Sequence, residues 1–60
     1  MYVLLTPYKT YFVEFLIGQL ILSSSIEEAM EFSDYDTAFK FQKMLIQTCK
    51  LETSINTFIK

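Results

Sequence analysis

The chain has 60 residues, 52% of them hydrophobic, with one cysteine, no histidine, no arginine and a net charge of −2. A single cysteine excludes an internal disulfide, and without histidine the chain lacks both a common zinc ligand and the side chain that transfers protons near pH 7. The lack of arginine argues against direct nucleic-acid recognition, because arginine supplies many contacts to phosphate and guanine. A chain this short forms one domain at most, and we expect residues 1–60 to be a single small domain.

The most apolar segment, residues 11–22, is too short to span a membrane as a helix. Such a helix needs about 20 apolar residues, whereas this run contains Glu14 and Gln19. A secretion signal would begin with basic residues ahead of the apolar run, and here the first eight residues contain none. We therefore expect no membrane or secretion segment, and a lone cysteine, Cys49, fits a reducing cytoplasmic environment.

The first part of the chain predicts three strands. Residues 2–6 are rich in aromatic and aliphatic side chains, and Pro7 ends this strand and opens a turn. Residues 11–17 alternate as a second strand. Gly18, the only glycine, predicts a tight turn or a bulge, and residues 19–23 form a third strand.

The second strand has one mixed and one fully apolar face. Because side chains alternate along a strand, Phe12, Glu14 and Leu16 share the mixed face. If a helix covers the opposite face, Phe12 and Leu16 point away from the core. The residues of the apolar face are Tyr11, Val13, Phe15 and Ile17.

Residues 26–32 are ambiguous. Ser24 and Ser25 each precede a glutamate by three positions, which is the spacing of a capping box and predicts a short helix from Ile26. The apolar residues that follow also fit a strand or an irregular crossing segment. We favour extended or irregular structure here.

Residues 33–50 predict an α-helix. Ser33 is a good N-cap, and Asp36 three residues later completes a capping box. Acidic residues in the first turn and lysines further along complement the helix dipole. The expected core stripe consists of Ala38, Phe41, Met44, Leu45 and Cys49.

Phe39 and Ile46 lie beside this core stripe and widen the apolar arc from about 140° to about 220°. One helix on a small sheet buries only part of such an arc. We therefore expect Phe39 and Ile46 to belong to a second contact surface, although they also fit the margin of the core.

The last ten residues, 51–60, alternate and are rich in threonine and isoleucine, which favours a final strand. Leu51, Ile55 and Phe58 also fit a helical spacing. The expected fold class is therefore α+β: a three-stranded antiparallel β-meander with one packed α-helix and a C-terminal strand.

Nothing in the sequence predicts catalysis. There is no pairing of Cys or Ser with His, and one glycine cannot make a Gly-rich phosphate loop. The acidic residues between positions 27 and 36 lack the spacing and the central glycine of a calcium loop. We expect no enzyme, no cofactor and no metal site.

The stretch AMEFSDYDTAFKFQKML, residues 29–45, combines a small residue, an aromatic residue, a polar cap and a helix that begins with alanine and aromatics. This pattern resembles many short proteins of bacteriophages and mobile elements of Gram-positive bacteria, in which a β-meander precedes a helix. The resemblance implies a cytoplasmic accessory protein that binds and blocks a host factor, such as a defence or DNA-metabolism enzyme. It assigns no functional residues.

The leading hypothesis is a small non-enzymatic interaction module that is a homodimer and acts by occupying a surface of another protein, such as a host protein. Surplus apolar surface on the sheet and on the helix favours self-association, because a twofold contact buries the same patch on both copies. The expected apolar and acidic interface residues are Phe12, Leu16, Phe39, Ile46, Glu27, Glu28, Glu31 and Asp34.

Three alternatives remain. A single-stranded nucleic-acid-binding module would use Tyr8, Lys9 and Tyr11, since aromatic side chains stack on bases and lysine contacts phosphate. One lysine neutralises little phosphate charge, which makes nucleic acid an unlikely partner. The acidic residues could instead mimic nucleic acid in a basic groove of a host protein. The third alternative is a structural subunit of a larger assembly.

Overall fold

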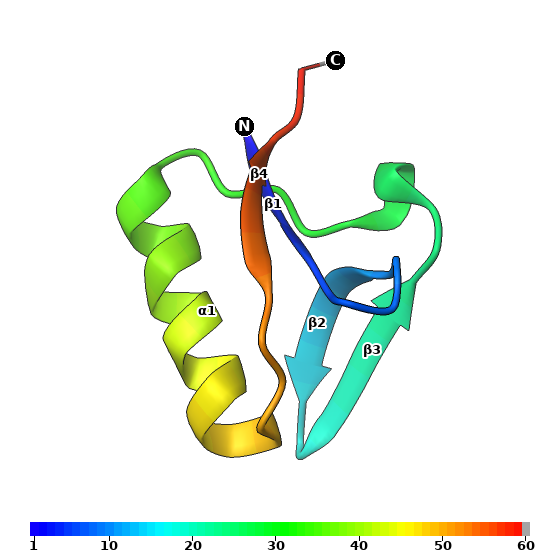
Figure 1. Cartoon of the computed structure of the whole chain (residues 1–60), viewed down its shortest axis with the longest axis vertical. Coiled ribbons are helices and arrows are strands. Elements are labelled where there is room, and N and C mark those ends of the chain that lie inside the picture. Colours follow the sequence, from blue (N-terminus) through cyan, green and yellow to red (C-terminus); the bar gives the residue numbers. More distant parts are fainter. Residues whose placement is uncertain (60) are drawn as a thin grey trace.

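The structure, a computed structural model, describes residues 1–59. Over these residues one antiparallel sheet with the strand order β3-β2-β1-β4 lies beside one α-helix (Figure 1). The expected α+β class, with a three-stranded meander, a helix and a C-terminal strand, is confirmed. The elements are β1 (Tyr2–Leu5), β2 (Tyr11–Leu16), β3 (Gln19–Ser23), the short 3₁₀-helix η1 (Ile26–Glu28), α1 (Tyr35–Cys49) and β4 (Ser54–Thr57).

Residues 6–10 join β1 to β2, and Thr6 organises this loop. The Thr6 amide donates to the Thr10 carbonyl at 2.8 Å, and the Lys9 amide donates to the Thr6 carbonyl at 3.3 Å. The Thr6 side chain is buried, and its hydroxyl lies 2.6 Å from the Thr10 hydroxyl. Lys9 closes the loop with φ 62°, the left-handed position typical of such loops. The turn predicted at Pro7 is confirmed.

A two-residue turn joins β2 to β3. Leu16 pairs with Gln19, which leaves Ile17 and Gly18 as the central residues, with φ values of 49° and 73°. Positive φ at both central positions is the type I′ arrangement, whose twist matches that of the flanking strands. The predicted turn at Gly18 is confirmed, but a β-branched residue such as Ile17 rarely adopts a left-handed conformation.

Residues 29–32 lie between β1 and β2 where these strands diverge. β1 pairs with β2 at Leu5 and Tyr11. Further along, the Met30 amide donates to the Phe12 carbonyl at 3.0 Å, and Phe32 bonds to Tyr2 of β1. The chain thus returns from the β3 side of the sheet to the helix through an extended bridge segment (Figure 1). Of the ambiguous residues, 29–32 are extended or irregular as favoured, whereas the preceding three form η1.

The core lies between the helix and the sheet. Its buried members are Leu4, Phe12, Phe32, Ala38 and Leu45. Half-buried side chains of the strands pack around them, namely Phe15, Leu20 and Leu22. The helix residues expected in the core, Phe41, Met44 and Cys49, pack there as well.

The expectation that Phe12 points outward is wrong. A register shift between Phe12 and Glu14, a β-bulge, interrupts the alternation of β2. Phe12 is fully buried, whereas Glu14 and Leu16 are exposed. Phe15 stays on the core side, and Ile17 leaves the strand for the turn, so the predicted apolar face of Tyr11, Val13, Phe15 and Ile17 does not exist as one surface.

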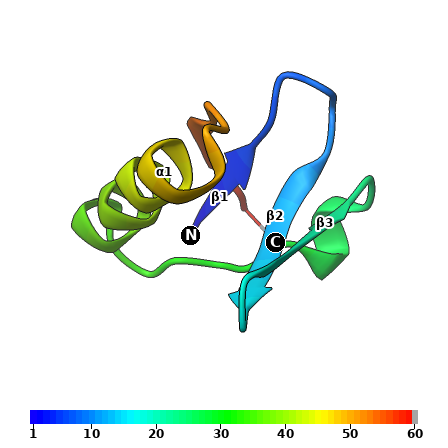
Figure 2. The same cartoon turned by 90° about the horizontal axis from the view of Figure 1, so that it is seen from below.

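Helix α1 packs on β1 and β4, and the β2–β3 hairpin extends on the far side of β1 from the helix (Figure 2). The N-cap of α1 is Asp34 rather than Ser33. The Asp34 carboxylate accepts hydrogen bonds from the Thr37 amide at 3.2 Å and the Thr37 hydroxyl at 2.8 Å. The helix ends at Cys49, and the C-cap Lys50 has φ 53° and donates its amide to the Ile46 carbonyl.

Candidate interaction surfaces

The outer stripe of α1 consists of Tyr35, Phe39, Lys43 and Ile46, which lie within about 80° of one another around the helix axis. Tyr35, Phe39 and Ile46 are 53%, 41% and 45% exposed, well above a core position. The Tyr35 and Phe39 rings stack with centroids 6.4 Å apart, and the Lys43 Nζ lies 5.2 Å from the Phe39 centroid. The stripe is therefore an ordered apolar surface that carries one cation.

Two of these residues, Phe39 and Ile46, were predicted from the helix pattern, and Tyr35 was missed. Tyr35 is the first residue of α1 and precedes Phe39 by four positions, so the two side chains are neighbours on one face. This four-residue spacing in the sequence could have identified Tyr35 as a neighbour of Phe39. Tyr2 of β1 meets the Tyr35 ring edge to face at 5.8 Å, which ties this end of the stripe to the sheet.

The tip of the β2–β3 hairpin is a second exposed apolar surface. Leu16, a predicted interface residue, is 60% exposed, and Ile17 beside it is 96% exposed. Phe12, predicted to share a surface with Leu16, is in the core instead. Ile17 was assigned to the core face from the sequence because the expected strand ran through residue 17, whereas β2 ends at Leu16 and Ile17 lies in the turn.

The four predicted acidic residues do not form one patch. Glu27 and Glu28 are exposed on η1, and the Glu28 carboxylate accepts a hydrogen bond from the Ser23 hydroxyl. Glu31 is half-buried in the bridge segment, and Asp34 caps α1. In Figure 1, η1 and the start of α1 lie on opposite sides of β1 and β4. The Glu28 and Asp34 carboxylates thus have local structural roles.

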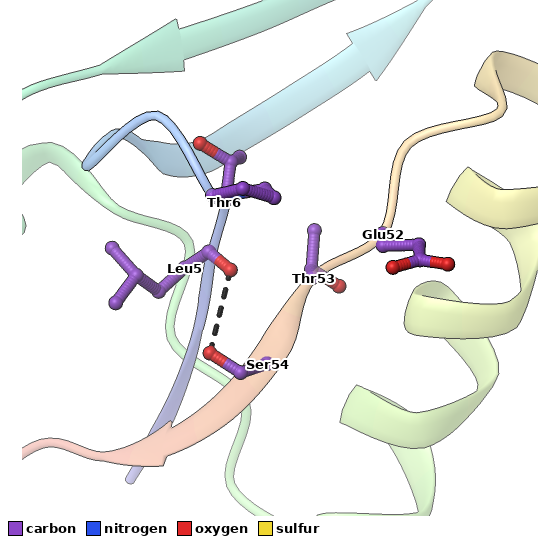
Figure 3. Close-up of a pocket in the computed structure, with 6 residues that line it drawn as sticks. Leu5, Thr6, Glu52, Thr53 and Ser54 are labelled. Atoms are coloured by element: carbon purple, nitrogen blue, oxygen red, sulfur yellow. Dashed lines mark hydrogen bonds between the residues drawn. The ribbon is translucent and has the colours of Figure 1, made fainter.

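A shallow groove of about 390 Å³ lies where the end of β1 meets the start of β4 (Figure 3). The Ser54 hydroxyl donates to the Leu5 carbonyl at 3.5 Å, and the buried Thr53 hydroxyl has no hydrogen-bond partner among residues 1–59. Of the described residues that line the groove, Glu52 alone is ionisable, so they form no acid–base pair. The lining residues are Leu5, Thr6, Pro7, Glu52, Thr53 and Ser54.

The residues proposed for nucleic-acid stacking lie in and after the β1–β2 loop. Tyr8 is 77% exposed and Lys9 is exposed, whereas Tyr11 is half-buried at the start of β2. Cys49 is a half-buried thiol at the end of α1. Within residues 1–59, no three His, Cys, Asp or Glu side chains gather closely enough to hold a metal ion. Over the same residues, no helix has the length and hydropathy needed to cross a membrane.

Comparison with protein-family models, with curated proteins and with solved structures finds no match to this chain. A functional assignment therefore has to start from the two exposed apolar surfaces described above.

Proposed function

We propose that this chain is a small non-enzymatic interaction module that binds another protein through the outer stripe of α1. The observation that carries the proposal is the ordered, exposed aromatic pair Tyr35 and Phe39 with Ile46 on the same face. Aromatic side chains are enriched at the energetic centres of protein interfaces, since they bury a large area with few rotatable bonds.

The stripe fits the mode in which one face of a helix lies in an apolar groove of the partner. Tyr35, Phe39 and Ile46 recur with helical spacing along three turns, as the anchors of a groove-bound helix do. Lys43 projects from the same face and Lys40 from a neighbouring one, so the matching groove has carboxylates along its rim. The partner is thus a protein with an apolar, acid-rimmed groove.

Following the resemblance of residues 29–45 to short phage and mobile-element proteins, we place this partner in the cytoplasm of a bacterial host. Binding would block whatever normally occupies the partner's groove. The chain then acts by occupying a surface and needs no chemistry of its own.

The test begins with capture of host proteins on the immobilised chain and continues with purified candidates titrated in solution. The double substitution Phe39→Asp and Ile46→Asp is expected to weaken binding at least about tenfold, because each removes a central apolar contact. The control is Thr48→Asp, which adds an acidic residue at an exposed position of α1 outside the stripe.

Both variants must show the circular dichroism of the parent chain. If the folded double variant binds the partner as tightly as the parent and the control do, the outer stripe is not the binding surface. If no host protein binds the parent chain at micromolar concentration, the proposed function is wrong.

A further inference from the structure

The outer edge of β3 is an unprotected sheet edge. β3 pairs with β2 on one side, and its backbone makes no hydrogen bond to any other element of residues 1–59. Sheet edges are normally blunted by charged side chains, proline or bulges, because open backbone groups recruit another strand. The five residues of β3, Gln19–Ser23, contain no charge and no proline.

The opposite edge of the sheet differs. Near β4, the Gln42 side chain donates to the Thr53 carbonyl at 2.6 Å, and the Asn56 side chain donates to the Ser54 carbonyl at 3.5 Å. Helix α1 also packs on β4. Side chains thus bond to backbone carbonyls at the start of β4 and just before it, and the helix packs on this strand, whereas no backbone group of residues 1–59 bonds to the open edge of β3.

We propose that a second copy of this chain pairs with β3 antiparallel to its own β3, about a twofold axis at Ile21. The two four-stranded sheets then form one continuous sheet of eight strands. This inference stands apart from the outer stripe of α1, which lies on the helix and remains exposed in such a dimer.

The sequence of β3 fits a copy of itself. It reads Gln-Leu-Ile-Leu-Ser, so the order of polar and apolar residues is the same from either end. Antiparallel pairing about Ile21 places Leu20 opposite the partner's Leu22, and Gln19 opposite the partner's Ser23. Opposite residues share a face and are in contact, so apolar meets apolar, polar meets polar, and no like charges are opposed.

The same register joins the two cores. Leu20 pairs with Phe15 and Leu22 with Phe12 across the β2–β3 ladder, and all four side chains belong to or pack against the core. In the dimer, the Leu20 and Leu22 side chains of both copies therefore meet on the core side of the sheet. Half-buried leucines of each copy gain apolar neighbours.

We expect the dimer to be weak. Five paired residues in each copy bury less than the roughly 1,200 Å² of small specific interfaces. The dissociation constant should therefore lie in the micromolar range, with the monomer prevailing in dilute solution. The test measures the mass of the full chain by sedimentation equilibrium from micromolar to millimolar concentration.

In the first comparison, Ile21→Lys places two ammonium groups opposite each other at the twofold axis and is expected to raise the dissociation constant at least about tenfold. Within its own chain the new lysine lies opposite Glu14 of β2, so the fold should persist. The matched control, Ile46→Lys, carries the same change on the outer stripe and should leave the mass unchanged.

A second comparison covers the case in which Ile21→Lys does not fold. In a Cys49→Ser background, Ile21→Cys should form a disulfide-linked dimer on mild oxidation. Opposed antiparallel residues have Cα atoms about 4.5–5.5 Å apart, within disulfide range. Ile46→Cys in the same background should stay monomeric. A chain that is monomeric at every concentration, or a dimer that depends on Ile46 and does not cross-link at position 21, overturns the proposal.

Discussion

Tyr2 and Phe32 exchange two backbone hydrogen bonds, each of 2.9 Å, although neither bond belongs to a pair of neighbouring strands. The contact fixes the bridge segment against β1 and brings the Phe32 side chain into the core, where its ring lies 5.0 Å from that of Phe41. Residues 29–32 thus link β1 and β2 through backbone hydrogen bonds where these strands diverge, and they connect the sheet to the helix.

Hydrogen exchange should reveal this arrangement. The amides of Tyr2, Met30 and Phe32 all donate to backbone carbonyls between segments distant in sequence, so their exchange requires near-global unfolding. We expect protection similar to that of β1, and fast exchange for the exposed Ser24 amide. Exchange measured by NMR checks this. If the Phe32 amide exchanged as fast as that of Ser24, the bridge would not be part of the stable fold.

The corrected position of Phe12 makes a second prediction. Phe12→Ala removes a fully buried ring, and such changes cost about 3–5 kcal/mol. A domain of this size has a net stability of only about 3–5 kcal/mol, so the variant should be largely unfolded at 25 °C. Thermal melts in dilute solution check this.

The comparison for Phe12→Ala is Leu16→Ala. This change removes an exposed side chain from the same strand and should alter the free energy of unfolding by no more than about 0.5 kcal/mol. Equal destabilisation by the two changes would restore the assignment of both residues to one surface.

The strands, the turns and the helix were readable from the sequence because each rests on local signals. Pro7 and Gly18 mark turns, and the 3.6-residue repeat marks the core stripe of α1. The bulge in β2 was not readable, because Phe12 and Val13 are both apolar and alternation fits either register. The tertiary pairing decides which one faces the helix.

The candidate surfaces, too, were predictable only where a local sequence pattern marks them. The helical repeat places Phe39 and Ile46 outside the core stripe, and the structure shows both exposed. Scattering of the acidic residues, by contrast, follows from the path of the bridge segment across the sheet, which depends on backbone contacts such as that between Met30 and Phe12. No local pattern encodes those contacts.

The N-cap of α1 provides a third prediction. Ser33 and Asp34 are both good N-cap residues, and the structure selects Asp34, whose carboxylate accepts two hydrogen bonds from Thr37. Asp34→Ala should lower the free energy of unfolding by about 1 kcal/mol. Ser33→Ala, one residue earlier, should have little effect. Chemical denaturation of both variants checks this, and a larger loss for Ser33→Ala would place the cap at Ser33.

The turn between β2 and β3 leads to the last prediction. Ile17 has φ 49°, a conformation that β-branched residues disfavour, whereas Asn before Gly is the preferred sequence of a type I′ turn. Ile17→Asn should therefore raise the free energy of unfolding of the monomer by about 0.5–1 kcal/mol. Thermal melts in dilute solution measure the change.

Gly18→Ala is the matched control for Ile17→Asn. An added Cβ at Gly18 meets no atom of residues 1–59 within 4 Å, so any loss of stability, expected to be about 1 kcal/mol, comes from the backbone at φ 73°. A lower melting temperature for Ile17→Asn would mean that Ile17 makes a stabilising contact within the monomer that outweighs its backbone strain.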